Sequence, residues 1–266
     1  MSDSRVALTI AGSDSGGGAG IQADLKTFHQ FGVFGTSALS AVTAQNTIGV
    51  TAIHLVPPAI LRAQLDAVFT DLRPDAAKTG MLGTKDHIRT VVRCLEEYRF
   101  ESLVVDPVMV ATSGDRLLEA DARISMAEEL VPRATVVTPN IPEAEELVGD
   151  QIASVDDMIR VGEKILRLGA RAVLITGGHH AGDSVQDVYV DPEGVKVFAR
   201  PRLNTTSTHG TGCTLSAAIA ACLARGETMR RAVERAGNFV HRAIANAPCL
   251  GSGNGPVNHL VDPGIQ

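Results

Sequence analysis

The sequence predicts an α/β protein with a mostly parallel central sheet and helices on both of its faces. Short apolar segments alternate with amphipathic helical segments along most of the chain, and this alternation is typical of parallel strand–helix–strand units. Chemically active residues follow several of the expected strands, at the edge where open parallel sheets bind ligands. No linker, internal repeat or low-complexity run divides the 266 residues, so we expect a single domain over residues 1–266.

The elements follow one another in a regular order. An apolar strand over residues 6–11 leads into a glycine-rich loop over 12–20 and a helix over 21–31. Periodicity then predicts helices at 57–72, 85–98, 121–130, 142–147 and 155–168, and strands at 76–81, 103–106, 135–138 and 172–176. Two strand-like pieces at 186–190 and 195–198 flank an Asp-Pro-Glu-Gly turn and predict a hairpin. A helix that ends at residue 224 and another over 228–247 complete the expected fold.

The composition excludes several classes of partner. Lys and Arg number 24 against 30 Asp and Glu, and basic residues are not interleaved with aromatic ones, so we expect no nucleic-acid partner. No apolar run approaches the roughly 18 residues that cross a bilayer, and we expect no membrane partner. The four cysteines form no C-x-x-C pair, and the first residues lack a basic-then-apolar signal region. These features favour a reducing, cytoplasmic location.

Several common catalytic motifs are absent from the sequence. A Walker A loop needs lysine after its last glycine, but Gly17 is followed by Gly18, which excludes a P-loop nucleotidase. The G-x-G-x-x-G fingerprint of dinucleotide binding is incomplete in both glycine-rich loops. The adjacent His179 and His180 have no second ligand pair at a spacing that suits zinc. The G-x-S-x-G sequence of serine hydrolases does not occur.

The sequence Thr-His-Gly-Thr-Gly-Cys at residues 208–213 runs directly into a helix of small residues. Glycines allow a sharp turn, and the first N–H groups of a helix have no intrahelical partner, so such a junction binds anions such as phosphate. A helix start should also lower the pKa of the Cys213 thiol, which would make the thiol a usable base. The alternative is a tight loop in which Cys213 is only a small buried residue.

Six segments of the chain carry long motifs, at residues 11–26, 42–47, 78–82, 106–109, 138–145 and 208–213. Together they resemble the hydroxymethylpyrimidine/phosphomethylpyrimidine kinase family of thiamine biosynthesis. The resemblance implies a ribokinase-like fold, ATP and Mg²⁺ as cofactors, and two successive phosphorylations. The first is on the hydroxymethyl group of the pyrimidine and the second is on the resulting monophosphate. The resemblance also implies a homodimer in the cytosol.

The resemblance implies a role for each part of the anion loop. Cys213 is the base that takes the substrate proton, at a position where most ribokinase-like enzymes have aspartate. The N–H groups of Gly210, Thr211 and Gly212 hold the transferring phosphoryl group. The residues expected to bind the nucleotide are Asn140, Thr176, Thr208, Gly210 and Gly212.

Gln45 is the residue expected to recognise the pyrimidine. One amide can pair with both a ring nitrogen and an exocyclic amine, as glutamine does with adenine. The alternative is a glutamine that only caps the end of a strand. Further residues that match pocket positions of the family are Gly12, Ala19, Asp24, Met81 and Val108.

Two carboxylates are the candidate metal ligands. Asp106 and Glu143 match the family positions that hold Mg²⁺, and hard oxygen ligands suit this ion. Glu143 has a second interpretation, because Asn140-x-x-Glu143 is also the signature of a helix N-terminus. The two roles are compatible with each other.

One position departs from the pattern of the family. Thr176 stands where a lysine usually precedes Gly-Gly-His, so the cation that would neutralise the phosphates is missing there. Lys78 and Arg202 are candidates to replace it. Two other functions stay open: a pyridoxal/pyridoxine kinase of the same superfamily, and a ligand-binding or regulatory homologue without efficient transfer.

Overall fold

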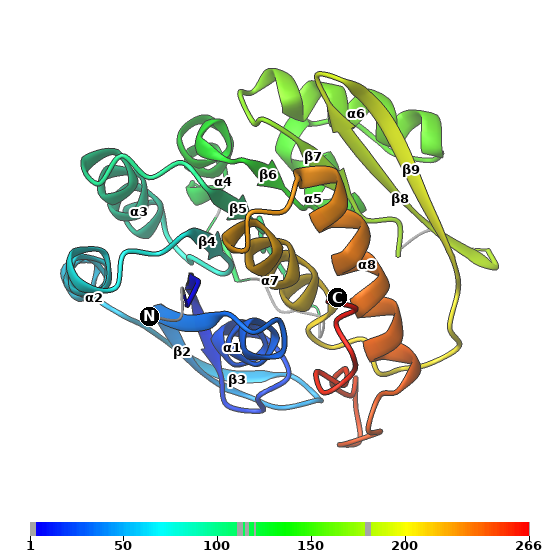
Figure 1. Ribbon diagram of the computed structural model, residues 1–266, viewed down its shortest axis with the longest axis horizontal. Helices are drawn as coiled ribbons and strands as arrows, with labels where there is room; N and C mark the ends of the chain where they lie inside the picture. Colours follow the sequence, from blue (N-terminus) through cyan, green and yellow to red (C-terminus); the bar gives the residue numbers. More distant parts are fainter. Residues whose placement is uncertain (1–3, 111–113, 115–116, 120, 179–181, 266) are drawn as a thin grey trace.

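The computed structural model describes residues 4–110, 114, 117–119, 121–178 and 182–265. Its strands are β1 (Val6–Asp14), β2 (Phe34–Gln45), β3 (Val50–Leu55), β4 (Ala76–Thr79), β5 (Leu103–Val105), β6 (Val136–Val137), β7 (Val173–Ile175), β8 (Ser184–Asp191) and β9 (Gly194–Pro201). Within the described residues these nine strands form one sheet, in the order β3-β2-β1-β4-β5-β6-β7-β8-β9 (Figure 1). All neighbours from β2 to β7 pair in parallel, and β3, β8 and β9 add antiparallel edges.

Helices cover both faces of this sheet. They are α1 (Gly20–Gln30), α2 (Pro58–Asp71), α3 (Lys85–Glu97), α4 (Ala122–Ser125), α5 (Ile141–Val148), α6 (Val155–Arg167), α7 (Thr211–Ala224) and α8 (Met229–Ala245). One apolar core joins the sheet to α1, α7 and α8, and the other joins it to α2, α3 and α6. The predicted class, an α/β fold with a mostly parallel sheet and helices on both faces, is confirmed. No helix in the described part of the chain is long and apolar enough to span a bilayer.

The sequence did not predict β2 and β3. The buried positions of β2 carry small or polar residues, so its alternation of buried and more exposed positions has no counterpart in hydrophobicity. β3 lies at the sheet edge with five of its six residues exposed, so little hydrophobic patterning marks it. The helix expected at 121–130 is α-helical only in α4 and continues as a π-helical turn over Met126–Leu130. His179 and His180 lie outside the described residues.

α7 is the helix that places the anion loop. Most of its residues are small, and Ala217, Ala218, Ala220 and Ala221 are fully buried, so the helix approaches the sheet closely. It packs against β1, β4 and β5 on one side and against α1 and α8 on the other. An apolar surface all round is typical of a buried helix. The N-terminus of α7 lies at the carboxyl edge of the parallel strands.

Candidate active site

A cavity of about 640 Å³ opens at the carboxyl edge of the sheet. Almost all of the residues expected in the site line it, although they come from distant parts of the chain. These residues are Gly12, Ala19, Gln45, Met81, Asp106, Val108, Asn140, Glu143, Thr176, Thr208, Gly210, Thr211, Gly212 and Cys213. The exception is Asp24, which does not line the cavity.

The anion loop and the glycine-rich loop after β1 are in close backbone contact. Gly210 has a φ of 81° and forms the N-cap of α7 without a side-chain cap. A Cβ on Gly210 would lie 1.8 Å from the carbonyl oxygen of Gly18. A Cβ on Gly18 would in turn lie 2.4 Å from Cδ2 of His209. Glycine is therefore required on both loops, and the uncapped first turn of α7 offers its N–H groups to an anion.

The thiol of Cys213 has a different pKa from the one expected. Burial raises the pKa of Cys213 to about 12. The positive charge of Lys78 lowers it, but Asp24 and Asp106 oppose that effect. The expectation of a lowered pKa is therefore wrong, because the loss of hydration outweighs the charge of Lys78 and the hydrogen bond from the Gly20 main chain. In the unliganded protein Cys213 carries its proton at neutral pH.

A buried ion pair lies behind the cavity wall. The Nζ atom of Lys78 is 2.9 Å from both carboxylate oxygens of Asp24 and 3.9 Å from Oδ2 of Asp106. The side chains of Lys78 and Asp24 are both fully buried, and the Thr9 hydroxyl donates to Asp24 at 2.6 Å. Asp24 on α1 therefore serves to neutralise Lys78, and its predicted place in the substrate pocket is wrong. Lys78 is committed to this pair and does not reach into the cavity to replace the missing lysine.

Asp106 and Glu143 are two buried carboxylates, and the positive charge near them does not offset the effect of burial on their pKa values. Burial raises the pKa of Asp106 to about 6. Burial and the charge of Asp106 together raise the pKa of Glu143 to about 8. Among the described residues no three or more His, Cys, Asp or Glu side chains converge as a metal site. Two carboxylates nevertheless fit Mg²⁺, which is commonly held by one or two of them together with waters and substrate phosphates.

Glu143 also caps α5. Its Oε2 atom accepts a hydrogen bond from the Asn140 N–H at 2.9 Å, and Asn140 Oδ1 accepts one from the Glu143 N–H at 3.0 Å. This reciprocal pair is a complete capping box. The capping interpretation of Glu143 is confirmed, and its metal-binding role stays a prediction.

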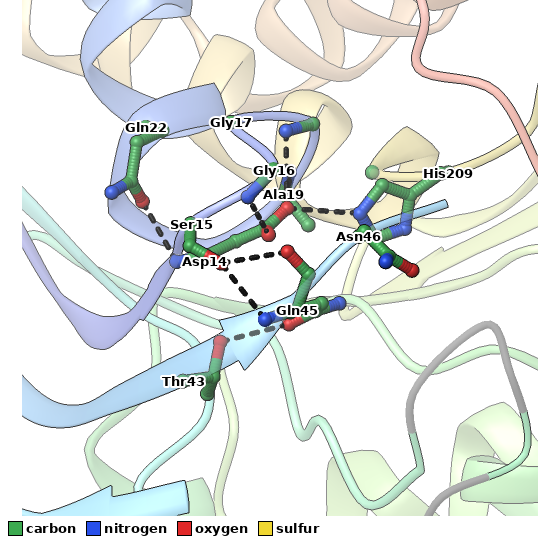
Figure 2. A network of polar contacts seen from close by, with 12 residues as sticks. Asp14, Ser15, Gly16, Gly17, Ala19, Gln22, Thr43, Gln45, Asn46 and His209 are labelled. Atoms are coloured by element: carbon green, nitrogen blue, oxygen red, sulfur yellow. Dashed lines mark hydrogen bonds and ion pairs between the residues drawn. The ribbon is translucent and has the colours of Figure 1, made fainter. Parts of the chain in front are cut away.

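Asp14 organises the glycine-rich loop around its carboxylate (Figure 2). The N–H groups of Gly16, Gly18 and Ala19 donate to it at 2.7, 3.0 and 2.8 Å, and Nε2 of His209 lies 2.9 Å away. Burial would raise the pKa of Asp14, but these hydrogen bonds hold the pKa below its ordinary value. Sequence reasoning gave neither Asp14 nor His209 a role. An aspartate just before a glycine run is the signal for such a turn.

The C-terminal segment supports the anion loop from behind. The His209 N–H donates to the carbonyl of Gly255 at 3.0 Å. The Thr214 hydroxyl donates to the Gly210 carbonyl at 2.7 Å and lies 3.0 Å from Nε2 of the buried His259. Because the one hydroxyl proton is used on Gly210, Nε2 of His259 carries the proton of the second bond. Residues near the end of the chain thus fix the first turn of α7.

Gln45 stands at the end of β2 and is half-buried. The Ser15 hydroxyl donates to the Gln45 carbonyl at 2.6 Å and accepts from the Gln45 N–H at 2.8 Å. The Thr43 hydroxyl contacts the Gln45 side-chain oxygen at 3.2 Å. Figure 2 shows these contacts at the carboxyl end of the strand. Sequence reasoning missed both Ser15 and Thr43.

One of the two cations considered as replacements for the missing lysine, Arg202, lines the cavity. The main chain of Thr176 bridges to Asn140, and both residues line the cavity. Arg202 also lines it, and its guanidinium donates to the carbonyls of Gly182 and Gly178 at 2.7 and 3.1 Å. Of the two cations considered as replacements for the missing lysine, Arg202 is therefore the one that faces the cavity.

Comparison with known proteins gives a consistent result. Residues 14–258 match the family described as phosphomethylpyrimidine kinase. The hydroxymethylpyrimidine/phosphomethylpyrimidine kinase of Bacillus subtilis strain 168 is 50% identical over 256 residues, which cover 96% of this chain and 94% of that protein. A phosphomethylpyrimidine kinase structure from Clostridium difficile 630 is 45% identical with a TM-score of 0.81, over 90% of this chain and 99% of that one. The ADP complex of a Bacillus subtilis pyridoxal kinase is 40% identical with a TM-score of 0.90, over 97% and 98% of the two chains.

Proposed function

The chain belongs to the phosphomethylpyrimidine kinase family, and we propose that it phosphorylates 4-amino-5-hydroxymethyl-2-methylpyrimidine and then the resulting monophosphate, with ATP as the donor. Its relatives include kinases and a bifunctional protein of thiamine biosynthesis, and the chain is a phosphotransferase of this pathway. One observation carries the proposed chemistry. A glutamine amide, an uncapped helix N-terminus and a thiol all line the same cavity.

The residues of the cavity divide into a recognition part and a transfer part. The Gln45 amide pairs with the ring nitrogen and the exocyclic amine, and Met81 and Val108 supply apolar contacts to the ring. Gly12 and Ala19 keep the wall of the cavity close to the ring because they carry little or no side chain.

The N–H groups of Gly210, Thr211 and Gly212 stabilise the charge of the transferring phosphoryl group. Asn140, Thr176 and Thr208 bind the nucleotide, with Arg202 as the cation beside its phosphates.

The substrate hydroxyl attacks the γ-phosphorus, the bond to the bridging oxygen of ADP breaks, and the hydroxyl proton passes to the thiolate of Cys213. Because the pKa of Cys213 is raised to about 12, the thiolate is a minor species at neutral pH. We expect kcat/KM to rise with pH between 7 and 9. Full turnover by a Cys213→Ala variant would exclude Cys213 as the base.

Asp106 and Glu143 are the residues that would hold Mg²⁺. The bound ion supplies positive charge to the phosphates of the nucleotide. Support comes from the raised pKa values of Asp106 and Glu143, which a divalent cation between them would reverse.

The proposal includes the organisation of the protein. A single domain over residues 1–266 is supported by the one continuous sheet of the described strands. A homodimer is supported by the apolar side chains of Val42, Ile53 and Leu55, which are exposed on β2 and β3. A cytoplasmic location is supported by the cysteines, which form no C-x-x-C pair. Light scattering coupled to size-exclusion chromatography tests the dimer, and a monomer at micromolar concentration would contradict it.

An ADP-release assay with three substrates tests the function. We expect turnover with the pyrimidine alcohol and with its monophosphate, and a much lower kcat/KM with pyridoxal. Preference for pyridoxal would favour the kinase activity named for the Bacillus subtilis structure. Absence of ADP release with all three would leave a ligand-binding protein.

A further inference from the structure

The main chain of Gln45 is held in one position by its neighbours. A β-bulge separates Ala44 from Gln45, and bulges re-aim the side chains beside them. The Ser15 hydroxyl binds both the N–H and the carbonyl of Gln45. Only the side-chain torsions of Gln45 therefore remain to be fixed.

Thr43 fixes these torsions from two residues earlier on the same strand. Its side chain is 5% exposed, and its Oγ1 lies 2.9 Å from the Ser13 carbonyl and 3.2 Å from Oε1 of Gln45. The single hydroxyl proton is shared between these two oxygens in a three-centre arrangement. Ser13 belongs to β1, so the hydroxyl is anchored to a central strand. The oxygen end of the Gln45 amide thus lies beside Thr43, and the nitrogen end lies farther away (Figure 2).

The orientation of this amide decides how a 4-aminopyrimidine can bind. The ring presents a donor, the exocyclic amine, beside an acceptor, the ring nitrogen, and the hydroxymethyl group is attached next to the amine. A glutamine amide that turns over by 180° exchanges its own donor and acceptor. The ring would then have to turn over as well to keep both hydrogen bonds. The hydroxymethyl group would be carried to the opposite side of the pocket, so only one amide orientation presents it to the anion loop.

We infer that Thr43 is a specificity-determining positioning residue, which holds the Gln45 amide in the orientation that directs the hydroxymethyl group of an aminopyrimidine to the anion loop. The inference rests on the proposed function. Thr43 contacts no reacting atom in this scheme and acts through Gln45. Its contribution is preorganisation of the pocket before substrate enters.

The test is a double-mutant cycle on the phosphorylation of the pyrimidine alcohol. Thr43→Val keeps the shape of the side chain and removes the hydroxyl, and we expect kcat/KM for the alcohol to fall about tenfold, the size of one hydrogen bond. The KM for ATP should stay unchanged. Thr43→Ser restores the hydroxyl and should recover most of kcat/KM. In a Gln45→Ala background, Thr43→Val should cause no further loss, because there is no amide left to orient.

A matched control comes from the same strand. Thr36 also lies on β2, is 7% exposed, and donates its hydroxyl to a β1 carbonyl, that of Ala7, at 3.1 Å. Thr36→Val should leave kcat/KM for the pyrimidine unchanged, since Thr36 does not line the cavity. An equal loss in the Gln45→Ala background, or no loss with Gln45 present, would overturn the inference while the wild-type activity upheld the proposed function. A wild-type enzyme that is inactive on the pyrimidine would overturn both.

Discussion

Replacement of Lys78 by methionine should strongly destabilise the protein. The Lys78 ammonium is fully buried, 2.9 Å from both oxygens of Asp24, which is itself fully buried. Methionine fills much of the same volume but leaves the Asp24 carboxylate without its cation. Removal of one partner of a buried pair costs about 3–5 kcal/mol, because an uncompensated charge stays in the interior. At roughly 2–4 °C per kcal/mol for a chain of this size, the Tm should fall by about 6–20 °C.

Urea denaturation followed by circular dichroism at pH 7 measures this loss. Lys85 provides the matched control, because its Nζ is 2.8 Å from Asp121 while both side chains are about half exposed. Lys85→Met should leave the free energy of unfolding essentially unchanged, since solvent screens exposed pairs. The double variant Asp24→Asn, Lys78→Met should recover much of the lost stability, because the introduced asparagine carries no charge. If Lys78→Met unfolded within about 1 kcal/mol of the wild type, the buried pair would not have the role assigned to it.

Three further predictions concern Thr79, Glu143 and Thr176. Among the described residues, the Thr79 hydroxyl is the buried side-chain polar atom without a hydrogen-bond partner. Thr79→Val should therefore raise the free energy of unfolding by about 1 kcal/mol in a urea titration. A loss of stability would contradict this prediction. Glu143, whose pKa is raised to about 8, must lose its proton to bind Mg²⁺. The Mg²⁺ affinity, measured by calorimetry with ADP present, should therefore rise by up to about tenfold per pH unit between pH 6 and 8. A flat profile would exclude Glu143 as a ligand. Thr176→Lys should raise turnover with the pyrimidine monophosphate in a coupled ADP assay, and unchanged turnover would show that the lysine is dispensable.

The order of strands and helices was predictable where each element carries its own pattern. α3 and α6 show clear amphipathic spacing, and the expected ranges 85–98 and 155–168 differ from them by one residue. β2 has no comparable hydrophobic pattern, because small or polar residues fill its buried positions, and it is recognised as a strand only through its pairing with β1 and β3. Local sequence cannot reveal such support from distant strands.

The site was predictable to the extent that it follows the ends of strands. Asp106 and Thr176 are the last residues of expected strands, Asn140 follows another, and all three line the cavity. The prediction that Asp24 lines the pocket was wrong because its carboxylate pairs with a lysine 54 residues away. No local sequence pattern contains this contact. The predicted direction of the Cys213 pKa shift was wrong for a related reason, since the burial of the thiol depends on packing from the whole chain.

The contacts of the C-terminal segment with the anion loop have a consequence for synthesis of the protein. Gly255 and His259 fix His209 and Thr214, so the transfer site is incomplete until residue 259 has left the ribosome. The sheet and most of its helices have all their residues earlier in the chain, and they can form while the anion loop still lacks its support. A nascent chain whose residues 255–259 are still inside the exit tunnel should therefore be folded in large part and yet inactive.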